Sequence, residues 1–279
     1  MAIKTVVSGS TDLSLDASWS GAALPIAGDV GYLNEGTAVI VTGLTAIALN
    51  RFVVTSGFRG KLGTASSPVS MRVDNGTAPK MEIEGGTYHN VAAHTTGGIT
   101  TLVVNAAGVP VYINGTGTIA TLKCIAGQVE VGAGAVVTTL INNGAAVLVY
   151  DNATVLTSVV LAAGKCVSRR SATTWTQDGS AQGLLMDDEA ITTLNIGGGS
   201  LFNHQSTGTI GTLNMYGRGD YTPAGALQDT IVTTINKYGT GRLVGQAKQI
   251  RLTYTTLNDF AEGGTVIDGS LGLSGPDAG

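Results

Sequence analysis

A short phrase, Thr–Leu followed by alternating apolar and polar residues, recurs along the chain, and this repeat constrains the fold more than any other feature. The intervals between the central apolar residues are 20, 18, 19, 35, 19 and 22, and 35 is close to two intervals with a degenerate copy inside. Regular spacing of this kind indicates a solenoid, in which each turn of the chain packs on the previous one. The central residues are Leu102, Leu122, Leu140, Val159, Leu194, Leu213 and Ile235.

A second alternating segment follows most copies of the phrase after a Gly-containing turn, as in GVPVYING from Gly108 and GQVEVGAG from Gly127. Period-two alternation indicates strands with one inward face, and Gly permits sharp corners. A unit of about 19 residues cannot enclose a core alone but can do so by stacking. The sequence therefore predicts an all-β fold, a single-stranded parallel β-helix with about 19 residues per coil. The alternative is an antiparallel β-sandwich, which requires no fixed period.

Composition excludes several classes of protein. The 279 residues include 41 Gly, only 12% are charged, and the net charge is −4. The 15 Lys and Arg are scattered, with Arg169–Arg170 the one adjacent pair, so we expect no nucleic-acid partner. No apolar run is long enough to span a bilayer, and the opening residues MAIKTVVSGSTD lack the apolar core of a secretory signal. We therefore expect no membrane partner and synthesis in a host cytoplasm.

The two ends of the chain differ from the repeat. Residues 1–65 do not carry the Thr–Leu phrase, and residues 261–279 are polar and Gly-rich. The open end of a solenoid exposes unpaired strand groups and a core that needs covering. We therefore expect an N-terminal cap over 1–65, the parallel β-helix over 66–260, and a C-terminal tail over 261–279.

Asparagines recur at predicted turn positions, and two interpretations stay open for them. They could stack as amide ladders between coils, or they could serve ordinary turn chemistry. Cys124 lies in IATLKCI on the same face as Leu122, which predicts a buried thiol acting as a small hydrophobe. The asparagines concerned are Asn105, Asn142, Asn143, Asn195, Asn214 and Asn236.

Residues that could carry catalysis are few. Asp187, Asp188 and Glu189 are the acidic cluster that a glycosidase would need, but they also fit a solvated turn before Ile191, and aromatic residues make up only 5% of the chain. His89, His94 and His204 have no metal-ligand spacing and no accompanying Cys or acidic cluster. We therefore expect a protein that is not an enzyme and that holds no metal or cofactor.

The string SWSGAALPIAGDV from Ser18, the stretch Leu49–Gly63 and the TTLN…GG unit from Thr192 together resemble a family of β-helical structural proteins of tailed bacteriophages. The resemblance implies a virion component, and it covers most of the chain. Val159 departs from the family pattern by replacing Leu, and the stretch from Arg169 to Gly183 fits no coil, so we expect a projecting loop there. The matching residues are Trp19, Gly21, Pro25, Gly28, Asp29, Gly60, Lys61, Gly63, Thr192, Thr193, Leu194, Asn195, Gly197 and Gly198.

The expected function is that of a capsid decoration or cement protein, located on the capsid surface of the virion. Uncharged polar faces can pack against copies of the chain without desolvating many charges, so we expect a homotrimer that binds the major capsid protein. The cap would contact the capsid. Its candidate contact residues are equally consistent with a second interpretation, in which they form the core of the cap and its surface charges. The alternatives are a tail fibre or tailspike that binds host glycans, and a bacterial surface adhesin. The candidate contact residues are Trp19, Arg51, Phe58, Arg59 and Lys61.

Overall fold

The protein is all-β, and its chain divides into two compact units. Unit 1 comprises 1–140 and 145–154, and unit 2 comprises 141–144 and 155–279. Within the described residues the one helical element is a short 3-10 helix, η1 (Asp16–Ser18). The computed structural model describes residues 2–26, 28–34, 40–42, 49–71, 80–93, 98–132, 134–151, 153, 156–223, 230–244, 251–260, 266–268 and 272–274.

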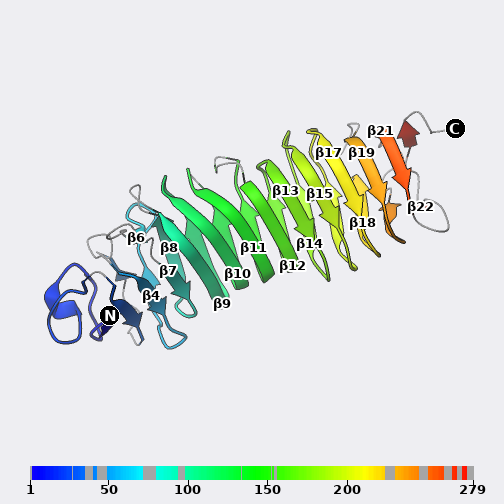
Figure 1. Cartoon of the computed structure of the whole chain (residues 1–279). Coiled ribbons are helices and arrows are strands. Elements are labelled where there is room, and N and C mark those ends of the chain that lie inside the picture. The colour runs from blue at the N-terminus through cyan, green and yellow to red at the C-terminus, as the bar shows by residue number, and fades with distance from the viewer. Residues whose placement is uncertain are drawn as a thin grey trace. The chain divides into compact units, whose positions relative to one another are not determined.

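Within each unit the strands follow one another in chain order (Figure 1). Unit 1 contains β1 (Ile3–Thr5), β2 (Val30–Leu33), β3 (Ile40–Val41), β4 (Arg51–Val54), β5 (Lys61–Leu62), β6 (Val69–Met71), β7 (Lys80–Ile83), β8 (Tyr88–Ala93), β9 (Ile99–Ile113) and β10 (Thr118–Val131). Both units share β11 (Val136–Val149). Unit 2 contains β12 (Leu156–Ser168), β13 (Ala172–Gln177), β14 (Gln182–Leu185), β15 (Ile191–Ile196), β16 (Leu201–His204), β17 (Ile210–Met215), β18 (Asp220–Pro223), β19 (Thr230–Lys237), β20 (Arg242–Val244), β21 (Arg251–Asp259), β22 (Val266–Asp268) and β23 (Gly272–Ser274).

Unit 2 is a parallel β-helix made of two stacks of strands. The first stack runs from β12 through β13, β15, β17, β19 and β21 to β23, and every pairing is parallel. The second stack runs from β12 through β14, β16, β18 and β20 to β22, again in parallel. Leu194 pairs with Leu213, 19 residues later, and Leu213 with Ile235, 22 residues later. The predicted solenoid is thereby confirmed, and the alternative prediction of an antiparallel β-sandwich is wrong.

Unit 1 has the same architecture. One stack runs through β1, β2, β4, β7, β9 and β10, and a second through β3, β5, β8 and β9, all in parallel. Leu102 pairs with Leu122, as the 20-residue interval predicts. Parallel pairing already begins at Ile3, so coils run through the 1–65 segment that the sequence predicts as a cap. The departures from parallel coils lie nearest the N-terminus, where η1 lies in the segment between Val6 and Trp19, which form an antiparallel bridge.

The core consists of stacked apolar side chains, and all seven predicted central residues are fully buried. In β15 the buried residues are Ile191, Leu194 and Ile196. Strict alternation is therefore interrupted once in each coil, because two consecutive residues, Thr192 and Thr193, lie outside the core. The same spacing of buried residues recurs in β13 and β17, so the interruption is a property of the coil.

The stretch from Arg169 to Gly183 forms a complete coil, and the predicted projecting loop is wrong. In β13, Trp175 lies between Val159 and Leu194 in the stack, which divides the 35-residue interval into 16 and 19. The buried indole takes the place of the usual Leu and meets the Phe202 ring edge to face at 5.4 Å. At Gly183 a Cβ would meet Gln177 Oε1 and come within 2.7 Å of the Phe202 ring, so the glycine makes room for these two side chains.

Candidate functional site

A ladder of asparagine side chains runs along the outside of the first stack of unit 2. Asn214 Nδ2 donates to Asn195 Oδ1, and Asn236 Nδ2 donates to Asn214 Oδ1, each at 2.8 Å. The ladder continues at Asn258, whose Nδ2 donates to Asn236 Oδ1 at 2.8 Å. At its other end, Asn195 Nδ2 donates to Thr176 Oγ1 at 3.1 Å. Three of the six predicted asparagines therefore form an amide ladder, and Asn258 extends it.

Asn142 serves turn chemistry instead. Its side chain is buried, its Oδ1 accepts a hydrogen bond from the Gly144 backbone N–H at 3.1 Å, and its Nδ2 donates to the Lys165 carbonyl at 3.1 Å. Asn105 lies opposite Ala126 on the next coil, so it has no asparagine neighbour there. Both interpretations of the asparagines are thus correct, at different positions.

Three aromatic rings stack beside the asparagine ladder. Tyr216 and Tyr238 lie 5.1 Å apart between ring centroids with 7° between their planes, and Tyr238 and Phe260 lie 5.0 Å apart with 8°. Each ring follows its ladder asparagine by two residues, so one coil repeat places both columns. All three side chains are exposed, from 45% for Tyr216 to 62% for Phe260. Exposed stacked rings beside amides form a surface suited to binding another molecule.

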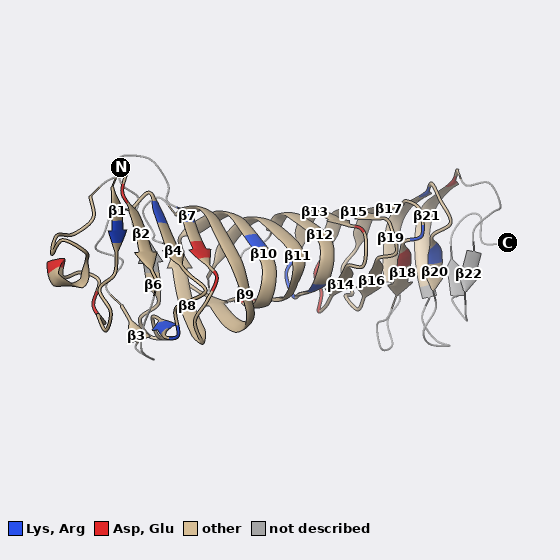
Figure 2. Ribbon diagram, turned by 90° about the horizontal axis from the view of Figure 1, so that it is seen from below, with Lys and Arg blue, Asp and Glu red and all other residues tan. Residues whose placement is uncertain are grey.

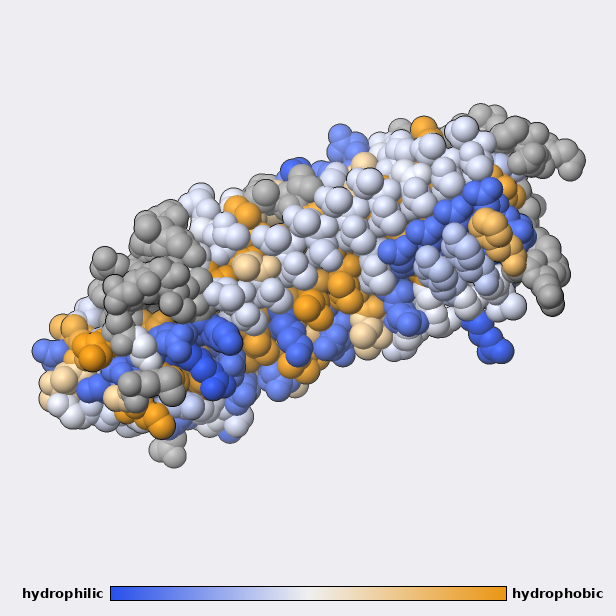
Figure 3. All heavy atoms as spheres, viewed as in Figure 1, coloured by the Kyte–Doolittle hydropathy of each residue, from blue (hydrophilic) through white to orange (hydrophobic). Residues whose placement is uncertain are grey.

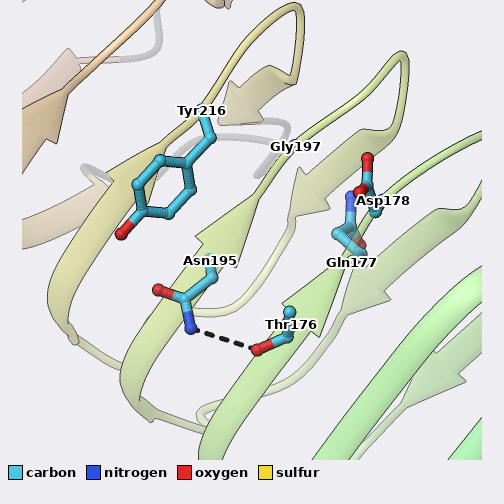
Figure 4. Close-up of a pocket in the computed structure, with 6 residues that line it drawn as sticks. All are labelled: Thr176, Gln177, Asp178, Asn195, Gly197 and Tyr216. Atoms are coloured by element: carbon cyan, nitrogen blue, oxygen red, sulfur yellow. Dashed lines mark hydrogen bonds between the residues drawn. The ribbon is translucent and has the colours of Figure 1, made fainter.

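A pocket of about 410 Å³ opens at the start of this aromatic stack. It crosses three coils, because Thr176, Gln177 and Asp178 come from the coil of β13, Asn195 and Gly197 from that of β15, and Tyr216 from that of β17. Figure 4 shows Tyr216 and Asp178 on either side of Gly197. Turns at this corner require glycine, since Gly179, Gly198 and Gly217 all have positive φ, from 58° to 61°. The size of the pocket lies within the range of about 300–1,000 Å³ that holds small ligands.

The acidic cluster has a structural role. Glu189 pairs with Arg170 at 3.1 Å and accepts a hydrogen bond from the Ser171 backbone N–H at 2.7 Å. Asp187 lies 3.7 Å from an Arg169 guanidinium nitrogen. These pairs tie two successive coils together. Asp187 and Asp188 are exposed, as the solvated-turn interpretation requires, whereas the Glu189 side chain is only 13% exposed.

The buried titratable groups are packed into the core. Burial lowers the pKa of His89 to about 4, although its hydrogen bond to the Gly85 carbonyl opposes the shift. Burial likewise lowers the pKa of His204 to about 4 and raises that of Cys166 to about 12. Cys124 is buried, as predicted. His94 lies outside the described residues, and among those described no group of three His, Cys, Asp or Glu could hold a metal ion.

Two of the predicted contact residues lie in the core. Trp19 is fully buried, and its Nε1 donates to the Leu13 carbonyl at 2.8 Å. Phe58 is also fully buried and stacks on His89 with 6.3 Å between ring centroids. Their burial assigns both side chains to the interior of unit 1, where they could meet a partner only after rearrangement.

The three basic candidates lie nearer the surface. Arg51 forms a two-point pair with Glu82, with one N···O distance of 2.9 Å. Arg59 donates to the Ser56 carbonyl at 3.1 Å, and the Lys61 ammonium lies 5.8 Å from the centre of the Tyr88 ring. Arg59 and Lys61 are exposed, so both remain available for a contact.

Sequence reasoning missed an exposed apolar surface near the N-terminus, which we call the N-terminal apolar surface. Figure 3 shows several exposed apolar side chains at this end of unit 1, interspersed with hydrophilic ones. Short hydrogen-bonded links hold its segments together, among them Leu24 N–H to Asp16 Oδ1 at 2.8 Å and Lys4 Nζ to the Ala23 carbonyl at 3.2 Å. Its members are Ile3, Val7, Leu15, Leu24, Ile26 and Ile40, with exposures from 36% to 70%.

No family model, curated protein or solved structure matches the chain. Among the described residues there is no helix with the length and apolar character needed to span a membrane.

Proposed function

We propose that this protein is a structural component of a tailed-bacteriophage virion, specifically a decoration or cement protein that binds the major capsid protein on the head surface. The resemblance in the Trp19 and Thr192–Asn195 motifs motivates the assignment. The observation that carries it is the N-terminal apolar surface, because large apolar side chains exposed together mark a place where a partner binds.

The concentration of exposed apolar residues supports docking through this end. Twelve large hydrophobic side chains are exposed among the described residues, and six of them belong to the N-terminal apolar surface within the first 40 residues. Lys61 pairs with Ile40 of this surface across neighbouring strands, so it is placed to serve as one polar residue at the edge of an apolar interface. Trp19 and Phe58 are fully buried, so this proposal no longer uses them as capsid contacts.

The low charge of the coils supports a covering role and a homotrimer. Lys, Arg, Asp and Glu are sparse along the ribbon (Figure 2). A face of Thr, Asn and Gly can pack against a copy of itself with little desolvation of charge. A trimer also multiplies a weak contact with the shell, so that the assembled attachment is far stronger than each single one.

Loss of the apolar side chains tests the docking proposal. The variant Ile3→Ser/Leu15→Ser/Ile26→Ser removes three side chains that are each more than half exposed. Its stability should stay close to wild type, because surface substitutions usually change the free energy of unfolding by less than about 0.5 kcal/mol each. Purified protein is added to virions that lack it, and bound copies are counted by quantitative mass spectrometry. We expect at least a tenfold loss of bound protein.

A matched control is Val160→Ser/Ile231→Ser, which removes exposed apolar side chains from unit 2. The control should decorate as well as wild type. Full decoration by the N-terminal variant, or equal loss in both, would reject docking through the N-terminal apolar surface. Location at the tail in a few copies, instead of on the shell in many, would favour a tail fibre or tailspike.

A further inference from the structure

The aromatic stack stops at Tyr216 because the preceding coil offers no ring. Met215 pairs with Ile196, and Ile196 with Gln177, so the next residue in each coil places Tyr216, Gly197 and Asp178 in one column. The backbone confirms this alignment, since Tyr216 N–H donates to the Ile196 carbonyl and Gly197 N–H to the Gln177 carbonyl. Gly197 therefore leaves a notch one coil wide between a tyrosine ring and a carboxylate.

The notch has the dimensions of one ring. Coils lie about 4.8 Å apart, so the backbones of Asp178 and Tyr216 are separated by about 10 Å across the glycine. The occupied part of the same column spaces its rings by 5.0–5.1 Å. A ring-shaped body in the notch would thus continue the column at the spacing already present. The Asp178 carboxylate reaches this space, because a Cβ at Gly197 would lie 3.3 Å from its Oδ1.

We propose that the notch binds the pyranose ring of a neutral sugar. One face of a pyranose carries mainly C–H groups, which pack on an aromatic ring such as Tyr216. Its rim carries hydroxyls, which donate strong hydrogen bonds to a carboxylate. Asp178 Oδ1 accepts a bond from the Gly179 N–H at 2.8 Å, while Oδ2 makes no bond within the described part of the chain. That oxygen is available to hydroxyl donors.

The remaining lining residues favour an uncharged ligand. Thr176 and Asn195 are neutral and are held in position by their mutual hydrogen bond of 3.1 Å (Figure 4). No Lys or Arg lines the pocket, and its one charged residue is acidic. An acidic sugar would place its carboxylate near Asp178 with no cation to compensate, so the notch selects against it. Because the site is open and offers few contacts, its dissociation constant for a single sugar is expected to be about millimolar.

Ligand-observed saturation-transfer NMR on the full-length chain tests this assignment. The probes are methyl α-D-glucopyranoside, methyl β-D-galactopyranoside and N-acetylglucosamine, with glucuronate as the acidic counterpart, each at about 10 mM, tenfold above the expected dissociation constant. Tyr216→Ala removes the ring, Asp178→Asn removes the charge, and Gly197→Tyr fills the notch with the missing ring. Asp188→Asn is the matched control, since Asp188 is an exposed carboxylate of the same unit outside the notch.

Wild type and Asp188→Asn should show transfer to at least one neutral pyranoside and at least fivefold less to glucuronate. Tyr216→Ala and Gly197→Tyr should each reduce the neutral signal at least tenfold with unchanged far-ultraviolet circular dichroism. Asp178→Asn should weaken binding of the neutral sugar and should reduce the ratio of its transfer signal to that of glucuronate. Absence of transfer to all three neutral probes, a preference for glucuronate, or undiminished transfer in both Tyr216→Ala and Gly197→Tyr would overturn the proposal. None of these outcomes depends on how the protein attaches to a capsid.

Discussion

The asparagine ladder makes a quantitative prediction about stability. Asn214 is an interior rung, because its Nδ2 donates to Asn195 and its Oδ1 accepts from Asn236, both at 2.8 Å. Each such hydrogen bond contributes about 0.5–1.5 kcal/mol. Asn214→Ala removes two of them and is expected to lower the free energy of unfolding by about 1–3 kcal/mol. Asn258→Ala, at the last described rung of the ladder, removes the hydrogen bond to Asn236 and should cost about half as much.

Urea unfolding followed by far-ultraviolet circular dichroism measures these differences, with the slope of the transition checked for constancy. Asn203→Ala is the matched control, since Asn203 lies on β16 in the other stack, outside the ladder. The double variant Asn214→Ala/Asn236→Ala should cost less than the sum of the single changes, because the two residues share a bond. If Asn214→Ala costs no more than Asn203→Ala, the ladder does not stabilise the coils and the reasoning is refuted.

Three further predictions follow from the buried groups. Burial lowers the folded-state pKa of His89 and His204 to about 4, so the unfolded chain takes up protons between about pH 6.5 and pH 4 that the native chain does not; stability should fall as pH drops through this window, by up to about 3 kcal/mol per histidine. Thermal unfolding at pH 7 and pH 5 measures the effect, and an unchanged midpoint would contradict it. Cys166, with its pKa raised to about 12 by burial, should react with iodoacetamide only after denaturation, and rapid labelling of the native protein would show that the coil opens there. Leu213→Ala should cost about 3–5 kcal/mol in urea unfolding, because Leu213 is fully buried between Leu194 and Ile235, and a loss below about 1 kcal/mol would place it outside the core.

The sequence was sufficient to predict the coil wherever an apolar residue of ordinary size fills the central position. Leu194 and Leu213 align as their 19-residue interval requires. The 35-residue interval indicated a degenerate copy of the repeat, but the phrase could not be located in β13, because Trp175 fills the central position and the polar Gln177 takes the next inward one. Gly183 makes room for the Gln177 side chain and the Phe202 ring, and such an accommodation between neighbouring coils is a three-dimensional property that periodicity does not encode.

The N-terminal coils were missed for a different reason. β4 and β7 pair in parallel, but their paired residues Phe52 and Met81 are 29 residues apart in the sequence. The long connection between these two strands therefore obscures the repeat. Trp19 and Phe58 are large aromatic residues, and such residues are equally typical of an interface and of a core. Only burial separates these two roles, and it places both in the core.

The candidate site was partly visible in the sequence. An aromatic residue follows the ladder asparagine by two positions in NMY, NKY and NDF, and this recurrence was a usable signal for the stack of Tyr216, Tyr238 and Phe260. The notch was harder to predict, because it depends on a missing side chain, Gly197, lying in register between Asp178 and Tyr216. A glycine at a corner is ordinary until its neighbours in the column are known.

The central claim is that successive windings of the chain stack in parallel, one coil at a time. Spin labels test it at four exposed positions that follow one register through unit 2: Thr157, Thr173, Thr233 and Thr255. Double electron–electron resonance on T157C/T233C and T173C/T255C, each four coils apart, should give equal backbone separations of about 19 Å, and T157C/T255C about 24 Å. Unequal distances for the two four-coil pairs, or a five-coil pair no longer than they are, would contradict the parallel stack.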